Sequence, residues 1–276
     1  FVIMKEALQF MGPITFAAAR FFVGMGVLFL FVWVLKLGIP PKSSWKHFLI
    51  VGLLQTTIVF LFIMLALKFV DVGKTAILLY SMPMWSTLLA AKFLGEKVTV
   101  TKIVGLTIAM IGLLSILGTD LWTGKDRGHL IGELLIVLAA ISWACSNVYY
   151  RLKLETLPKI QSSAYQMLFG TIGLLIASFV AEWNTPIEWN ALSIYYVLFA
   201  GIFASALCFT VWFVILSIVD MVTSTVSIML VPVFSVLFGA ILLGEQLTIS
   251  VSIGSVLIIS GIIIAQLKRR EKVAHR

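Results

Sequence analysis

The sequence predicts an all-α polytopic membrane protein built from two inverted-topology repeats of five helices each. Its composition is the first reason: 61% of the 276 residues are hydrophobic and 12% are charged, which is more apolar surface than a soluble domain can bury. The second reason is a series of apolar runs, each close to the roughly 20 residues that cross a bilayer as a helix. The third is an internal repeat in the chain.

The internal repeat rests on Gly, Pro, polar and charged residues within otherwise apolar segments. Gly52 matches Gly201 and Gly112 matches Gly261 at one offset of 149 positions (201 − 52 and 261 − 112), with no gap between them. Shared hydrophobicity does not explain such matches, and an internal repeat in a membrane chain is typical of transporters. The same offset relates Asp71 to Asp220, Pro83 to Pro232, Gly95-Glu96 to Gly244-Glu245, Thr99 to Thr248 and Gly105 to Gly254.

Nine apolar runs are long enough to span the membrane, and helices are expected because lipid requires every backbone group to find an internal partner. The run at 130–150 opens the second copy, but its counterpart in the first copy is only the stub at 1–5. We therefore expect a ten-helix protein whose sequence here begins inside its first helix, leaving nine full spans. These spans cover 13–35, 47–69, 73–93, 99–118, 130–150, 160–181, 193–218, 222–243 and 248–267.

The repeats and the charged residues define domains and topology. We expect a first repeat at 1–118, an inter-repeat loop at 119–129, a second repeat at 130–267 and a basic tail at 268–276. Fourteen Lys and Arg residues fall on the side of the C-terminus and five on the other side, so the C-terminus is predicted to be cytoplasmic. Five helices per repeat make the second copy enter from the opposite face. The predicted location is the plasma membrane, with the bilayer as a partner.

Polar and aromatic residues within the spans are the candidate substrate site, because such groups are costly in lipid and need a reason to be there. Their mixture suits an uncharged or zwitterionic small molecule whose apolar part stacks on aromatic rings. The alternatives are interhelical hydrogen bonds for Ser and Thr, and positions at the membrane interface for Trp and Tyr. The candidates are Gln55, Thr56, Tyr80, Trp85, Trp143, Asn147, Tyr150, Trp212 and Ser227.

Two prolines occupy equivalent places in the fourth helix of each repeat. Pro83 and Pro232 each remove a backbone donor and kink the helix, which leaves carbonyl groups for a cavity or a neighbouring side chain. Paired interruptions of this kind point to a transporter's binding site and to a role in gating. The alternative is a kink that serves packing alone.

Arg20 is the one cation that the apolar runs place within a span. An unpaired cation there is expensive, so Arg20 is expected to hold a substrate carboxylate, to reach outward to the membrane surface, or to bind a backbone carbonyl. No Asp or Glu is expected in the middle of these spans. Glu133 is expected at the outer edge of its helix, and Lys74 is counted with the outer loops.

The sequence contains no motif for a metal, a cofactor or catalysis. His47, His129 and His275 are far apart and lack metal-ligand spacing, and no Gly-rich phosphate loop or nucleophile elbow is present. The basic residues are scattered over loops, so nucleic acid is not an expected partner. We predict a non-enzyme without a cofactor, which binds a small-molecule substrate and exists as a monomer or homodimer.

Three segments resemble the EamA family of the drug/metabolite transporter superfamily. They are the helix beginning at Trp143-Ala144, the segment from Asp71 through Pro83 to Leu94-Gly95-Glu96, and its twin from Asp220 through Pro232 to Leu243-Gly244-Glu245, with Gly254 and Gly261. The resemblance covers nearly the whole chain. It implies ten helices in two inverted repeats, cytoplasmic termini, a central cavity, and export of amino acids or related metabolites.

The predicted function is export of a small metabolite by alternating access, with the repeats rocking about Pro83 and Pro232. A multidrug exporter of lipophilic cations is one alternative, and it would require an intramembrane Glu. A carrier of nucleotide sugars or phosphate esters would require several cations in the cavity, whereas only Arg20 qualifies. An integral-membrane enzyme would require converging ionisable groups or a metal set.

Overall fold

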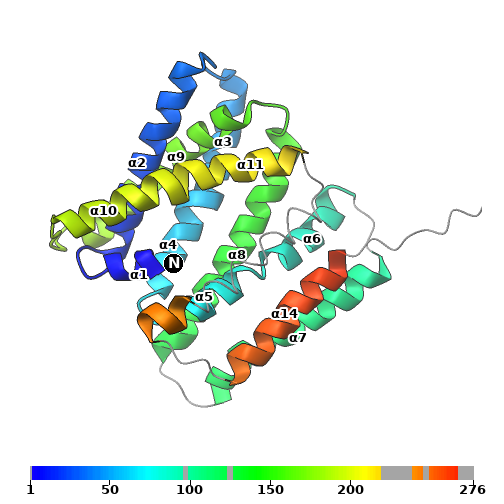
Figure 1. The fold of residues 1–276 in the computed structure, drawn as a ribbon. Helices are drawn as coiled ribbons and strands as arrows, with labels where there is room; N and C mark the ends of the chain where they lie inside the picture. The colour runs from blue at the N-terminus through cyan, green and yellow to red at the C-terminus, as the bar shows by residue number, and fades with distance from the viewer. Residues whose placement is uncertain (1, 96–98, 123–126, 219–237, 245–248, 267–276) are drawn as a thin grey trace, which may run out of the picture.

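The chain folds entirely into helices over the residues that the computed structural model describes, which are 2–95, 99–122, 127–218, 238–244 and 249–266. Figure 1 shows their arrangement. In chain order the elements are α1 (Val2–Ala7), α2 (Pro13–Val34), η1 (Lys42–Ser44), α3 (Trp45–Gly52), η2 (Leu53–Ile58), α4 (Val59–Ala66), α5 (Val72–Leu79), α6 (Met82–Phe93), α7 (Val100–Trp122), α8 (Arg127–Lys153), α9 (Lys159–Glu182), α10 (Ala191–Phe199), η3 (Ala200–Leu207), α11 (Cys208–Ile218) and α14 (Ile249–Gln266).

Six helical stretches of the described chain are long and apolar enough to cross a membrane. They coincide with six of the nine predicted runs, and α7 and α14 lie in two more. Most of the predicted run at 222–243 and the whole tail at 268–276 lie outside the described residues. The six stretches are Pro13–Val34, Lys42–Ala66, Val72–Phe93, Arg127–Lys153, Lys159–Glu182 and Ala191–Trp212. The protein is therefore a multi-pass membrane protein.

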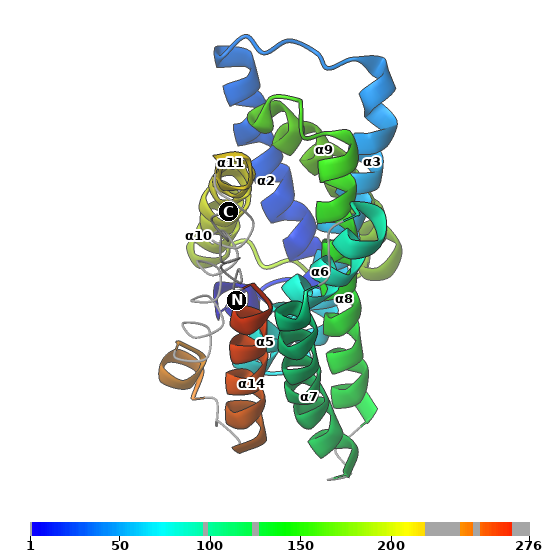
Figure 2. The same ribbon diagram turned by 90° about the vertical axis from the view of Figure 1, so that its right-hand side faces the viewer.

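Helices α7 and α14 lie side by side at one edge of the molecule (Figures 1 and 2). Helices α5, α6 and α8 separate this pair from α2. Four glycines allow their close approach. A Cβ added to Gly112 would lie 2.8 Å from the carbonyl oxygen of Gly254, and one added to Gly261 would lie 2.4 Å from that of Gly105. The earlier glycine of α7, Gly105, lies against the later glycine of α14, Gly261, and Gly112 lies against Gly254. The two helices are therefore antiparallel.

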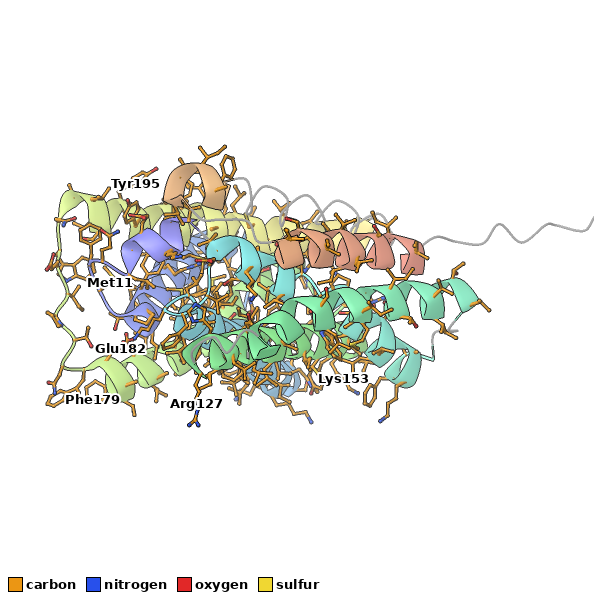
Figure 3. The ribbon with its side chains drawn as sticks, turned by 90° about the horizontal axis from the view of Figure 1, so that it is seen from below. Met11, Arg127, Lys153, Phe179, Glu182 and Tyr195 are labelled. Carbon is orange, nitrogen blue, oxygen red and sulfur yellow. The ribbon has the colours of Figure 1, made fainter. Side chains whose placement is uncertain are left out.

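Helices α2 and α9 are held together at both ends by side chains of α9. At one end the Glu182 carboxylate accepts from the Thr15 amide at 2.8 Å and from the Ile14 amide at 3.2 Å, at the start of α2. A carboxylate suits this site because a helix N-terminus carries a partial positive charge. At the other end the Gln161 side chain donates to the carbonyl oxygens of Leu37 and Gly38. In Figure 3 Glu182 lies near Met11, and Lys153 lies well away from both.

Two of the membrane helices contain a π-helical segment. Trp45–Ala66 is interrupted by η2, and Ala191–Ile218 is interrupted by η3. A π segment leaves carbonyl groups outside the regular ladder, and such segments often occur at functional sites. Polar side chains take up these carbonyls here: Ser142 donates to Leu54 O at 2.7 Å, and Ser205 donates to Ala200 O at 3.0 Å.

The span from Val72 to Phe93 is broken into α5 and α6 at Tyr80 and Ser81, immediately before Pro83. The Ser81 hydroxyl donates to Leu78 O at 2.7 Å, so it satisfies one carbonyl near the break. Every residue of α5 is buried. The short helix α5 therefore lies in the interior of the bundle, where it packs against α8.

Candidate functional site

A seam of polar side chains joins η2 to α8 and α9. The Ser146 hydroxyl of α8 donates to the Gln55 side-chain oxygen at 3.1 Å, and the Thr56 hydroxyl of η2 donates to the Gln166 side-chain oxygen of α9 at 3.0 Å. Thr57 donates to Gly170 O at 2.9 Å. The seam therefore brings two of the predicted residues, Gln55 and Thr56, into contact with helices of the second half of the chain.

Four polar atoms close to this seam have no hydrogen-bond partner among the described residues. Three are donors, namely the side-chain amide nitrogens of Gln55 and Gln166 and the indole nitrogen of Trp143; the fourth is the acceptor Oδ1 of Asn147. A buried polar group left unbonded costs about 1–3 kcal/mol. A ligand with acceptor groups would recover this free energy, so the arrangement favours a polar ligand that accepts more hydrogen bonds than it donates.

Aromatic side chains from α6, α8 and the α5–α6 break lie beside these polar groups. The rings of Tyr80 and Trp143 meet edge to face with centroids 6.3 Å apart. The Trp85 indole donates to the Ser81 hydroxyl at 3.2 Å, and the Asn147 amide donates to the Met82 sulfur at 3.4 Å. The break before Pro83 thus holds Trp85 and Asn147 in place around it.

The other sequence-predicted residues are separate from this group or undescribed. Tyr150 packs near the end of α8 in a second cluster with Phe48 and Tyr165, so the structure places it apart from Trp143. Trp212 lies on α11, where its indole nitrogen has no partner in the described part of the chain. Ser227 and Pro232 lie outside the described residues.

Arg20 is buried, with 2% of its surface exposed. Its Nε donates to the Ser205 hydroxyl of η3 at 3.1 Å, and its guanidinium carbon lies 4.8 Å from the ring centroids of both Phe21 and Phe60. Its side chain therefore does not extend to the protein surface, and it binds no backbone carbonyl among the described residues. No carboxylate pairs with it within the described ranges.

Lys74 and Glu133 correct two expectations. Lys74, counted with the outer loops, lies inside the span on α5 and is 8% exposed, and Glu133 lies within α8 and is 0% exposed. The two side chains form a buried ion pair. Hydropathy alone places both residues at helix ends, because the contact that buries them depends on the packing of α5 against α8. Sequence reasoning missed the pair, and its signal was a Lys and a Glu at the ends of two apolar runs.

Two hollows of the described structure lie apart from these groups. One has a volume of about 680 Å³, and its lining includes the charged residues Lys5, Lys68 and Glu188. The other, about 470 Å³, is an apolar groove between α2, α9 and α10 that includes Phe22 and Leu198. Neither hollow is lined by a sequence-predicted site residue. Among the described residues, no cluster of His, Cys, Asp or Glu is suited to hold a metal ion.

Comparison with known proteins matches residues 1–118 and 130–266 to the EamA-like transporter family. The uncharacterized transporter YoaV of Bacillus subtilis is 34% identical over 263 residues, which cover 95% of this chain and 89% of that protein. The probable amino-acid metabolite efflux pump of Escherichia coli is 25% identical over 273 residues, covering 96% and 89%. One solved crystal structure, 20% identical, superposes with a TM-score of 0.67 over 96% of this chain and 93% of that one, which establishes the shared fold.

Proposed function

The chain belongs to the EamA-like transporter family, and from this premise we propose that it exports a small metabolite, such as an amino acid, across the plasma membrane by alternating access. The observation that carries the proposal is the group of unbonded donors and aromatic rings around the broken span at Pro83. Transporter sites typically lie where a membrane helix is interrupted. The name of the Escherichia coli relative supports an amino-acid substrate.

Equivalent positions of the two halves support an inverted repeat of five plus five helices. The π segment η2 at 53–58 corresponds, at the offset of 149, to 202–207 within η3. The contacts between α7 and α14 are reciprocal in the same way, because Gly105 and Gly112 correspond to Gly254 and Gly261. Two halves with the same local structure but opposite orientation can exchange conformations, which is the basis of alternating access.

The cross-contacts between the halves support a site at their interface. A Cβ added to Gly52 would lie 2.8 Å from the Gly170 amide on α9, and one added to Gly24 would lie 2.9 Å from Gly201 O on η3. Each third helix thus packs closely on the second helix of the other half. We propose a C-terminus in the cytoplasm, with Pro83 and Pro232 as the points about which the halves move.

Glu133 bears on the multidrug alternative, which requires an intramembrane carboxylate. The structure contains one, but Lys74 pairs with it. A lipophilic cation would have to displace a buried ammonium to reach that carboxylate. Export of an acceptor-rich metabolite fits the donor-rich group around Gln55 and Trp143 better.

Counterflow uptake into proteoliposomes tests the proposed function. The panel contains aromatic and aliphatic amino acids, purines and one lipophilic cation. We expect uptake of an amino acid, reduced about tenfold by Trp143→Phe, since this variant keeps the ring but loses the unbonded donor. Trp45→Phe is the matched control, because its indole donates to Pro40 O at 3.3 Å, away from the site. Uptake of the cation alone would assign the protein to multidrug export.

A further inference from the structure

Arg20 is a buried cation whose charge has no carboxylate partner among the described residues. Its hydrogen bond to Ser205 uses one of the five N–H donors of a guanidinium. The four N–H groups on the two terminal nitrogens make no hydrogen bond to any described residue. An isolated buried charge costs several kcal/mol, so this arrangement requires compensation from elsewhere.

Phe21 and Phe60 compensate part of this cost without occupying the donors. Both rings lie 4.8 Å from the guanidinium carbon, and their faces attract a cation. The two rings also contact each other, with centroids 4.5 Å apart, and each contacts Phe209 of α11. A ring face attracts the charge of the guanidinium but accepts no conventional hydrogen bond from it, so the N–H donors at its edge stay available.

Ser205 decides which edge of the guanidinium stays open. Because it binds Nε, the edge formed by the two terminal nitrogens remains, and this edge can donate two parallel hydrogen bonds to one carboxylate. The Ser205 hydroxyl is itself held by its bond to Ala200 O within η3. The orientation of the arginine therefore depends on the π segment of the second half.

The rings beside Arg20 and the aromatic part of the candidate site pack against one hydrophobic core. Phe21 is a member of this core, and Phe60 and Trp143 pack against it. Tyr80 in turn contacts Trp143. A molecule with an anionic group at Arg20 and an apolar part at Tyr80 and Trp143 would thus contact residues of both halves.

We propose that Arg20 binds the carboxylate of the substrate end-on through its two terminal nitrogens, and that Phe60 and Ser205 are the residues that position it. This inference rests on the proposed carrier function and adds a required chemical group, a carboxylate. The aromatic rings beside Arg20 also stabilise its charge when no substrate is bound. A carrier returns empty after release, and the rings stabilise the cation in that state without competing with the substrate for its donors.

The test measures binding rather than transport, so that it is independent of the proposed function. Purified protein is heated with acetate, benzoate or L-phenylalanine, and with acetamide, benzamide or L-phenylalaninamide, at constant ionic strength. Unfolding midpoints over a concentration series give the affinity for each acid and for its amide. We expect at least one acid to bind about 10- to 100-fold more tightly than its amide, as a charge-assisted pair of hydrogen bonds predicts.

Variants of Arg20 test the residue itself. Arg20→Met should remove the preference for the acid. Arg20→Lys keeps the charge but not the planar fork, so it should fold and lose most of the preference. The proposal is wrong if the unmodified protein binds no acid more tightly than its amide, or if Arg20→Met keeps the preference.

Variants of the positioning residues separate orientation from packing. Phe60→Leu should reduce affinity for the acid about threefold to tenfold while affinity for the amide stays the same, and Phe60→Tyr should restore it because a phenol ring keeps the π face. Ser205→Ala should act in the same direction. Phe29→Leu is the matched control, since Phe29 lies on α2, as Arg20 does, but its ring contacts Tyr165. Equal losses for acid and amide in Phe60→Leu would overturn the positioning role.

Discussion

Lys74 and Arg20 are both buried cations, but their positive charges are stabilised by different kinds of neighbour. Lys74 is paired with the Glu133 carboxylate, and both side chains are almost fully removed from solvent. Arg20 is equally buried but meets two phenyl rings and one hydroxyl. The Glu133 carboxylate neutralises the first site, whereas no carboxylate within the described ranges neutralises the second. We infer from this difference that the Lys74–Glu133 pair stabilises the fold and that Arg20 binds the substrate.

The largest effect is expected from removing the carboxylate of the paired site. Glu133→Gln removes the carboxylate that pairs with the buried Lys74 ammonium, so the free energy of unfolding should fall by about 3–5 kcal/mol. Denaturant titration of the detergent-solubilised protein measures this change. A loss below about 1 kcal/mol would show that Lys74 reaches water and that the pair is not a closed site.

Glu182→Gln sharpens the comparison by removing a carboxylate that is only partly buried. Glu182 accepts from the Ile14 amide with Oε1 and from the Thr15 amide with Oε2, so the single oxygen of Gln can keep only one of these two bonds. One hydrogen bond and the attraction to the positive helix end are lost, so the same titration should show a loss of about 1–2 kcal/mol in the free energy of unfolding. A loss as large as that of Glu133→Gln would mean that any carboxylate on these helices is equally important.

Replacing both members of the pair should nearly restore stability. In Lys74→Met with Glu133→Leu, both charges of the pair are removed together, and apolar replacements of similar size are often neutral or stabilising. We expect a free energy of unfolding within about 1 kcal/mol of the starting protein. If the free energy of unfolding falls in the double variant by as much as the sum of the losses in the two single variants, the side chains do not act as a pair.

Arg20→Met should have the smallest effect on stability. The substitution removes a buried charge that no described carboxylate pairs with, which stabilises the protein. It also removes the attraction between this charge and the two rings, which destabilises it. We expect a change of less than about 1 kcal/mol in either direction by denaturant titration. A loss of several kcal/mol would indicate that Arg20 has a counter-charge and that the contrast with Lys74 does not hold.

The sequence predicts the fold better than the site. Length and hydropathy place six of the nine predicted spans on long apolar helices, because both depend on local composition. A proline within an apolar run indicates a break such as the one before Pro83. The Lys74–Glu133 pair was not predictable, since it joins residues 59 positions apart (133 − 74) through the packing of α5 on α8. The contacts of Arg20 with Phe60 and Ser205 have the same origin, although Arg20 itself is visible as a cation within a span.

The most direct test of the account is counterflow uptake by two variants side by side, Arg20→Met and the double variant Lys74→Met with Glu133→Leu. The substrate is whichever amino acid the unmodified protein transports in the panel. The account predicts that the double variant keeps most of the uptake rate and that Arg20→Met loses about 10- to 100-fold. Normal uptake by Arg20→Met together with loss in the double variant would reverse the two roles and contradict the account.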